Sequence, residues 1–182
     1  MPRLLLTLAL PLLAACNIGV IPRDLPPPAA EPEPTEPTAD PPAAAAEYRL
    51  DGNRLELPGP ISFQAGSDVL DPASDPALEH ARGYLLTKAA ISTLRIEGHA
   101  DDQALSERRA LAVGRWLIAH GIECRRLLAV GFGANKPLAD ASTPEGRAQN
   151  TRIELHNAAL LDRPIGGMPP DGGGQIAGEL CQ

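Results

Sequence analysis

Three side chains that could do chemistry stand close together in the sequence His99-Ala100-Asp101-Asp102. An imidazole beside two carboxylates could bind a metal ion or move protons. No second histidine lies at a spacing typical of a metal site, so we interpret His99 as a core or loop residue and predict no metal and no cofactor. Ser106 follows, but no nucleophile elbow surrounds it, so a hydrolase triad with His99 and Asp101 is not expected. The sequence predicts a protein without enzymatic activity.

A second candidate pair consists of Asp101 and Arg109. Asp101 comes directly after a predicted strand, where a loop presents it at the edge of a sheet. Arg109 lies four residues after Leu105 and four before Val113, so it shares their stripe on a predicted helix. An arginine on an inward stripe needs a partner, because an unpaired buried charge is costly. From the residues alone, two interpretations stay open: the two side chains pair with each other or one caps a helix, or they bind a ligand.

The hydrophobic pattern that must position these residues begins only after Tyr48. Alternating side chains predict strands at residues 61–63, 93–97, 127–130 and 152–155. Helical periodicity predicts helices at residues 75–90 and 104–120, with a short helical turn at residues 145–149. Asp75 is expected to cap the first helix and Gly121 to end the second. The order of these elements predicts an α/β (α+β) two-layer sandwich, in which one sheet packs on two main helices.

The net charge and the lengths of the apolar runs exclude two classes of protein: nucleic-acid-binding proteins and proteins with a membrane-spanning helix. The chain of 182 residues carries 16 Lys and Arg against 23 Asp and Glu, a formal net charge of −7. Proteins that bind nucleic acid draw affinity from basic side chains that neutralise phosphates, so no nucleic-acid partner is predicted. No stretch reaches about 18 consecutive apolar residues, so no membrane-spanning helix is expected.

The first residues have the pattern of a secretory signal peptide. Arg3 precedes an apolar run that is too short to cross a bilayer, and small residues follow it. The other interpretation, a buried helix, fits less well because Pro11 interrupts the run. The ending Leu13-Ala14-Ala15-Cys16 resembles a bacterial lipobox, which implies cleavage after residue 15 and acylation of Cys16. Two or more acyl chains anchor a protein stably, and Asn17 after the cysteine implies the outer membrane.

Residues 16–46 are expected to form a disordered tether behind the lipidated cysteine. The stretch from 21 to 46 contains nine prolines and five acidic residues and has no apolar periodicity. Such a composition buries too little apolar surface to offset the loss of chain entropy. In polyproline II geometry the segment reaches at most roughly 80 Å. The sequence therefore predicts a domain that can search some distance from its membrane.

Two further cysteines remain when Cys16 is lipidated. Cys124 precedes a predicted strand, and Cys181 is the penultimate residue. An even pair in an exported protein favours a disulfide, so we predict that this bond ties the C-terminal tail to the domain. The alternative is two free thiols.

Four blocks of sequence resemble those of a known family. They are Ile96-Glu97-Gly98-His99-Ala100-Asp101, Leu105-Ser106-Glu107-Arg108-Arg109-Ala110, Val130-Gly131-Phe132-Gly133 and Glu145 to Glu154. In this order they resemble the OmpA-like, peptidoglycan-associated lipoprotein domain, and the resemblance covers about residues 60–156. It implies a domain over residues 47–157, followed by a Gly/Pro-rich tail over 158–182. It also implies noncovalent binding of peptidoglycan through the diaminopimelate of its stem peptides, by a periplasmic domain anchored to the outer membrane.

The resemblance assigns roles to four residues. Asp101 and Arg109 match the residues credited with the diaminopimelate contact. An anion can hold the ammonium of that group, and a guanidinium can hold its carboxylate in a bidentate fork. Asn150 and Arg152 match an Asn-Arg-Arg signature in which Thr151 replaces the middle arginine. Arg152 is expected either to add a second positive group near the ligand or to lie exposed on a strand edge.

One departure from the family pattern supports a different function. About seven residues fewer separate Asp101 from Leu105, and Ala100 replaces a threonine. The shortened loop removes one wall of the usual pocket. Asp102 is expected to cap the following helix, or else to replace a lost carboxylate. The alternative function is an envelope assembly or interaction module that keeps the fold, has lost peptidoglycan binding and contacts other envelope proteins.

Overall fold

The computed structural model describes residues 47–181. The predicted signal peptide, Cys16 and the predicted tether lie outside the described residues. The strands are β1 (Leu50–Asp51), β2 (Arg54–Leu55), β3 (Ile91–His99), β4 (Leu127–Gly133), β5 (Arg152–Leu160), β6 (Arg163–Pro164) and β7 (Gln175–Ile176). The helices are α1 (Asp75–Thr87), α2 (Gln103–Ala119) and α3 (Pro144–Asn150), with short 3-10 turns at Pro72–Ser74, Cys124–Arg126 and Ile165–Gly167.

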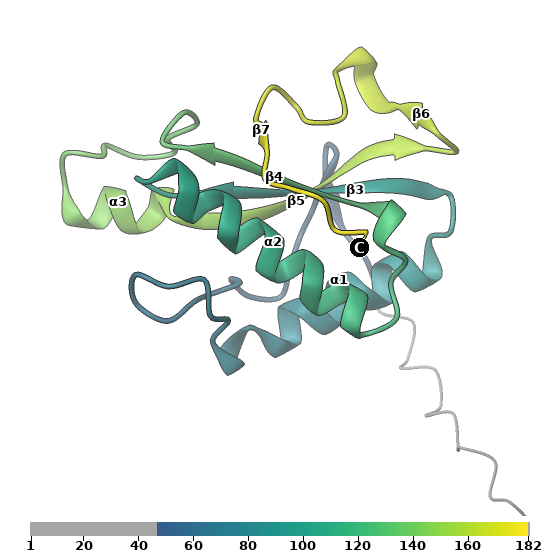
Figure 1. The fold of residues 1–182 in the computed structure, drawn as a ribbon, viewed down its shortest axis with the longest axis horizontal. Helices are drawn as coiled ribbons and strands as arrows, with labels where there is room; N and C mark the ends of the chain where they lie inside the picture. Colours follow the sequence, from purple (N-terminus) through teal and green to yellow (C-terminus); the bar gives the residue numbers. More distant parts are fainter. Residues whose placement is uncertain (1–46, 182) are drawn as a thin grey trace, which may run out of the picture. The chain divides into compact units, whose positions relative to one another are not determined.

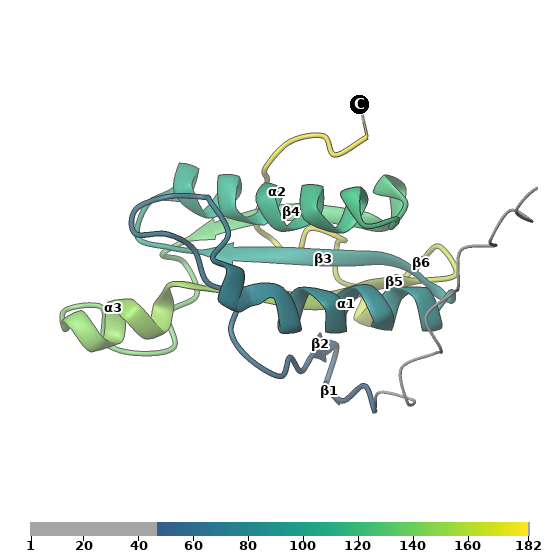
Figure 2. The same cartoon turned by 90° about the horizontal axis from the view of Figure 1, so that it is seen from below.

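All seven strands belong to one mixed sheet. Its order is β1-β2-β5-β3-β4-β7, and β6 pairs with β5. The central strands β3 and β4 are parallel and are joined through α2, whereas β5 runs antiparallel to β3. Helices α1 and α2 lie on one side of this sheet, and the segment between β5 and β7 arches over the other side (Figures 1 and 2). The two-layer sandwich expected from the sequence is confirmed.

The core forms where the apolar stripes of the helices meet the sheet. Helix α1 buries Leu78 and Leu85, and α2 buries Val113 and Leu117. They pack in one cluster with the alternate apolar residues of the central strands, which are Leu94, Ile96, Ile153 and Leu155. Apolar residues spaced by 3.6 positions on the helices and by two positions on the strands therefore face each other and form one continuous core.

Helix α1 ends at Thr87, three residues before the expected end. Its last carbonyls are satisfied from outside the helix, because Arg126 donates to the carbonyl oxygens of Leu85 and Lys88 at 3.0 and 3.1 Å. Helix α2 ends as expected, with Gly121 at a φ of +91° just beyond it.

The first strand of the sheet is not the one that the sequence predicted. Residues 61–63 form no strand, and Phe63 makes only an isolated bridge to Leu70. The sheet instead begins with the β1–β2 hairpin, whose turn contains Gly52 at a φ of +59°. Strands of two residues are too short to show a period, so sequence alternation cannot reveal them.

Glycine residues lie inside the central strands. Gly98 pairs with Gly131 in the parallel ladder and lies inside β3. A Cβ atom on Gly98 would lie only 2.1 Å from the Ser106 carbonyl oxygen. The glycine thus allows α2 to lie directly against the sheet, and it marks a close approach rather than a turn.

The C-terminal segment belongs to the sheet. Strand β5 continues to Leu160, and β7 pairs with β4 by opposing Ile176 to Val130. Leu180 then packs over Gly114 on α2. A disulfide joins Cys124 to Cys181, as the cysteine count predicted. The Gly/Pro-rich segment after residue 157 contributes β6 and β7 to the sheet. The sequence did not indicate these strands, because backbone pairing requires no apolar pattern.

Candidate functional site

Asp101 lies in the short connection between β3 and α2, where its side chain is exposed. The neighbouring Asp102 caps α2, since its Oδ2 accepts a hydrogen bond from the Leu105 amide at 2.7 Å. This confirms the expectation that Asp102 is a helix cap. The cap begins the helix immediately, so Asp101 is held close to the end of β3.

Arg109 is held from the side by the loop over residues 64–70. Only 8% of the residue is exposed, and its Nε donates to the Ser67 carbonyl oxygen at 2.9 Å. The guanidinium carbon lies 4.9 Å from the centroid of the Phe63 ring, within the range of a cation–π contact. Burial lowers the pKa of Arg109, and the charge of Asp68 opposes that effect. The group stays charged, because an arginine pKa is far above neutral.

The guanidinium of Arg109 keeps its two Nη nitrogens free. Neither makes a hydrogen bond to any residue in the range 47–181. No ion pair within that range joins Arg109 to Asp101. The interpretation that the two side chains only neutralise each other is therefore wrong in this structure. A fixed guanidinium with both Nη groups available can bind a carboxylate in a fork.

Asn150 and Arg152 are engaged inside the chain. The Asn150 side-chain oxygen accepts from the amides of Leu138 and Ala139 at 2.6 and 2.9 Å, and its amide nitrogen donates back to the Ala139 carbonyl. Arg152 donates from Nε to Oε1 of Glu154 at 2.9 Å. Asn150 thus secures the loop before α3, while Arg152 holds a carboxylate on the sheet.

The structure brings only some of the predicted site residues together. Asp101 and Asn150 line one small pocket, whose other walls are Ala100, Gly133, Ala134, Lys136, Pro137 and Ala141. Arg109 is not among the residues that line it. Arg152 touches the main-chain oxygen of Asn150 at 3.2 Å. The candidate site therefore has an acidic part after β3 and a separate guanidinium on α2.

A buried polar cluster was missed by sequence reasoning. It lies on β3 and β5 and contains Glu97, His99, Glu154 and His156. The ladder between these strands opposes Glu97 to Glu154. A signal was present, because charged side chains alternate along both strands, but only the register of β3 against β5 unites them. A spacing argument along the chain could not connect His99 with His156.

The two carboxyls of this cluster are strongly acidic. Burial alone would raise the pKa of Glu97, but the neighbouring His99, His156 and an arginine outweigh burial and lower it to about 2. At Glu154 the hydrogen bond with His156 lowers the pKa, burial opposes it, and a second arginine helps to bring it to about 2. Both groups are therefore carboxylates at neutral pH.

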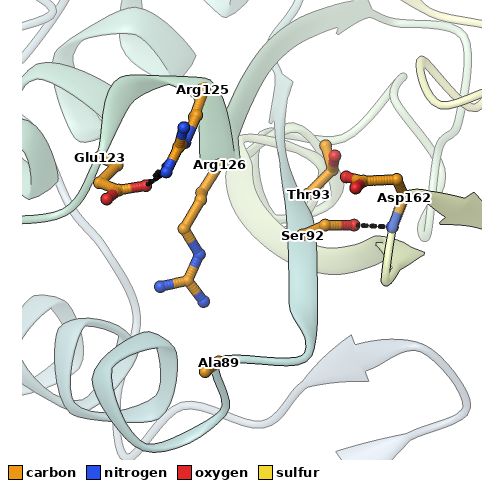
Figure 3. A pocket seen from close by; sticks show the side chains of 7 residues that line it. All are labelled: Ala89, Ser92, Thr93, Glu123, Arg125, Arg126 and Asp162. Carbon is orange, nitrogen blue, oxygen red and sulfur yellow. Dashed lines mark hydrogen bonds and ion pairs between the residues drawn. The ribbon is translucent and has the colours of Figure 1, made fainter.

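Another pocket lies at the opposite end of β3 (Figure 3). Both arginines that line it already have hydrogen-bond or ion-pair partners within the domain. Arg126 donates to three main-chain carbonyls, including that of Ile91 at 2.9 Å, and Arg125 pairs with Glu123 at 2.7 Å. These contacts fasten the end of α1 to the sheet and give this pocket a structural role.

The arrangement of the sheet and helices defines the class of domain. The periplasmic domain of Helicobacter pylori MotB has the same fold, with a TM-score of 0.51 and 22% identity over 59% of this chain and 77% of that chain. Residues 62–151 match the model of the OmpA family. The part of the chain over residues 62–151 is therefore similar to the OmpA family, as the sequence blocks indicated.

Two curated relatives match part of this chain. Probable lipoprotein YiaD of Escherichia coli is 33% identical over 107 residues, which are 56% of this chain and 49% of that protein. The peptidoglycan-associated lipoprotein of Pseudomonas aeruginosa is 35% identical over 101 residues, which are 51% of this chain and 58% of that protein. The chain thus spans about half of the length of these relatives. No helix within residues 47–181 is long and apolar enough to cross a membrane.

Proposed function

We propose that this protein binds peptidoglycan noncovalently and links the cell wall to the outer membrane. The observation that carries the proposal is the Arg109 guanidinium, which is buried and fixed, yet neither of its Nη groups makes a hydrogen bond within residues 47–181. The name of the Pseudomonas relative supports the same ligand, because that protein is described as peptidoglycan-associated.

The chemistry follows from the end group of diaminopimelate, which carries an ammonium and a carboxylate. The Nη groups of Arg109 accommodate the carboxylate, and the exposed carboxylate of Asp101 pairs with the ammonium. Because Phe63 and Ser67 already hold the guanidinium, little side-chain entropy is lost on binding. The reaction is binding alone, without turnover.

Attachment to the outer membrane belongs to the same proposal. Acyl chains at Cys16 fix one end of the chain, and the proline-rich segment over residues 21–46 spans the distance to the wall in the periplasm. The description of two relatives as lipoproteins supports this part. Both the cysteine and the segment lie outside the described residues.

A sedimentation assay with purified diaminopimelate-type peptidoglycan tests the ligand and its site. The protein is the full chain with Cys16→Ser, so that membrane binding does not contribute. Wild-type protein is expected to sediment with the wall, and Arg109→Ala and Asp101→Asn are expected to remain in the supernatant. Arg115→Ala is the matched control, because Arg115 lies exposed on the same helix.

Asp101→Asn makes the test independent of folding. Asp101 is exposed, so this change leaves the core intact, whereas Arg109→Ala also removes a buried contact. Circular dichroism of each variant verifies the fold. If folded Asp101→Asn and Arg109→Ala both sediment like the wild type, the assigned site is wrong.

The second candidate function is the envelope interaction module. The observation that favours it is the short connection over residues 100–102 between β3 and α2. If folded wild-type protein fails to sediment with peptidoglycan, this function replaces the first one.

A further inference from the structure

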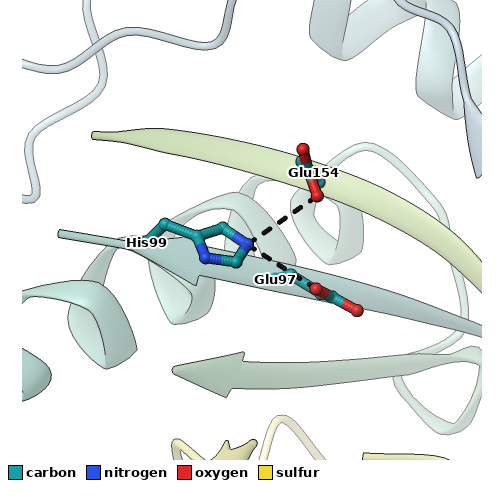
Figure 4. Close-up of side chains that lie close together, drawn as sticks. All are labelled: Glu97, His99 and Glu154. Carbon is teal, nitrogen blue, oxygen red and sulfur yellow. Dashed lines mark ion pairs between the residues drawn. The ribbon is translucent and has the colours of Figure 1, made fainter. Parts of the chain in front are cut away.

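Three residues of the buried cluster on β3 and β5 lie close enough together to hold a metal ion. Ligand atoms of Glu97, His99 and Glu154 all lie within 4.8 Å of one another. The Nε2 atom of His99 points between the two carboxylates, 3.6 Å from Glu97 Oε2 and 3.8 Å from Glu154 Oε2 (Figure 4). His156 approaches from β5, with its Nε2 3.2 Å from Glu154 Oε2.

His99 has no hydrogen-bond partner in this cluster. The residue is 1% exposed, and neither of its ring nitrogens makes a hydrogen bond within residues 47–181. Buried polar groups are nearly always satisfied, so an orphaned imidazole aimed at two carboxylates indicates a missing partner. Distances of 3.6 and 3.8 Å are too long for hydrogen bonds. They are close to the separation of about 3.4 Å between ligand atoms that surround a tetrahedral ion at about 2.1 Å.

The carboxylates are oriented as metal ligands are. Glu97 directs Oε1 to Arg95, which donates to it at 2.6 Å, and Glu154 directs Oε1 to Arg152 at 2.9 Å. The Oε2 atom of each carboxylate faces His99, and Glu154 Oε2 also lies 3.2 Å from His156 Nε2. Hydrogen bonds from outside the coordination sphere that fix ligand orientation are typical of metal sites.

We propose that Glu97 Oε2, His99 Nε2, Glu154 Oε2 and His156 Nε2 bind one divalent transition-metal ion of the Zn²⁺ type. Two imidazoles with two carboxylates suit Zn²⁺, whereas Ca²⁺ prefers six to eight oxygen ligands. His156 is 20% exposed at its side chain and provides the route from solvent. The site lies on the sheet and is separate from the Nη groups of Arg109.

Lys136 is the competitor of the metal. Its Nζ lies 3.4 Å from Glu97 Oε2, the oxygen that the ion requires, and 3.6 Å from the centroid of the Phe132 ring. With a side chain that is 44% exposed, Lys136 can swing into solvent when an ion enters. Its charge repels the incoming cation, so removing the ammonium is expected to strengthen metal binding.

Calorimetric titration of the full chain with Cys16→Ser, after treatment with EDTA, tests the site with ZnCl₂. The expected stoichiometry is one Zn²⁺ per chain, with no binding of CaCl₂ under the same conditions. Glu154→Gln and His156→Ala are expected to weaken the affinity at least tenfold, and Lys136→Met is expected to raise it. His120→Ala is the matched control, because His120 is an exposed histidine stacked on Trp116, away from the cluster.

A substitution at a buried position could unfold the domain, and its loss of Zn²⁺ binding would then say nothing about the site. Variants at partly exposed positions avoid this problem. His156→Ala and Lys136→Met alter partly exposed side chains, and circular dichroism verifies their fold. The proposal is overturned if the wild type binds no Zn²⁺, if binding survives His156→Ala unchanged, or if binding is lost with His120→Ala.

Discussion

Loss of the Cys124–Cys181 disulfide is expected to lower the free energy of unfolding by about 4 kcal/mol. The bond closes a loop between residues 57 apart in sequence. In the chain-entropy relation, a loop of this length removes about 14 cal/mol/K from the unfolded ensemble, or about 4 kcal/mol at 25 °C. The bond therefore stabilises the fold chiefly by restricting the unfolded chain.

The bond also secures the last strand of the sheet. Strand β7 has only two paired positions on β4, and Leu180 packs over Gly114 on α2. Without the covalent tie, these few contacts must hold the C-terminal segment alone. Cys181→Ser is therefore expected to expose the edge of β4 and to speed amide exchange there, at Gly131 above all, because the main-chain groups of Gly131 face β7 as the Ala129 carbonyl does.

Urea denaturation of the full chain with Cys16→Ser measures the effect, with oxidised and reduced protein compared. At an m-value of about 2 kcal/mol/M, a loss of about 4 kcal/mol moves the midpoint down by roughly 2 M. The m-value itself is expected to rise, because the uncrosslinked chain exposes more surface when it unfolds. Cys124→Ser should match reduced protein. Equal midpoints for oxidised and reduced protein would refute the reasoning.

Two further changes test how the domain positions its site. Gly98→Ala places a Cβ atom 2.1 Å from a main-chain oxygen of α2, so the helix must move away from the sheet, and overpacking of this kind costs about 1–3 kcal/mol. Thermal unfolding should show a lower midpoint than for Gly59→Ala, where nothing lies within 4 Å of the added atom; equal midpoints for the two variants would contradict the close approach. Asn150→Ala leaves two loop amides without their acceptor and is expected to lower the free energy of unfolding by about 1–3 kcal/mol in urea. A loss below about 0.5 kcal/mol would show that water replaces the lost oxygen.

The sequence by itself determined the parts of the protein that depend on local periodicity and chemistry. The apolar stripes of α1 and α2 and the alternation in the central strands predicted the sandwich, and the sequence favoured Asp102 as the cap of α2 over the alternative of a substitute carboxylate. The cysteine count predicted the disulfide. Each inference needs only neighbours within a turn or two of chain, or a small number of residues of one kind.

Tertiary structure decided everything that depends on contacts between distant segments. The hydrogen-bond partner of Arg109 is the main-chain oxygen of Ser67, 42 residues away in the sequence. Every residue carries such an oxygen, so no pattern of side chains can predict which one Arg109 contacts. The strands at residues 50–55 and 175–176 were hidden because two-residue strands have no period. His99 and His156 both approach Glu154 only because β3 and β5 pair in one register, and a shift of one residue would have turned one of the two histidines to the other face of the sheet.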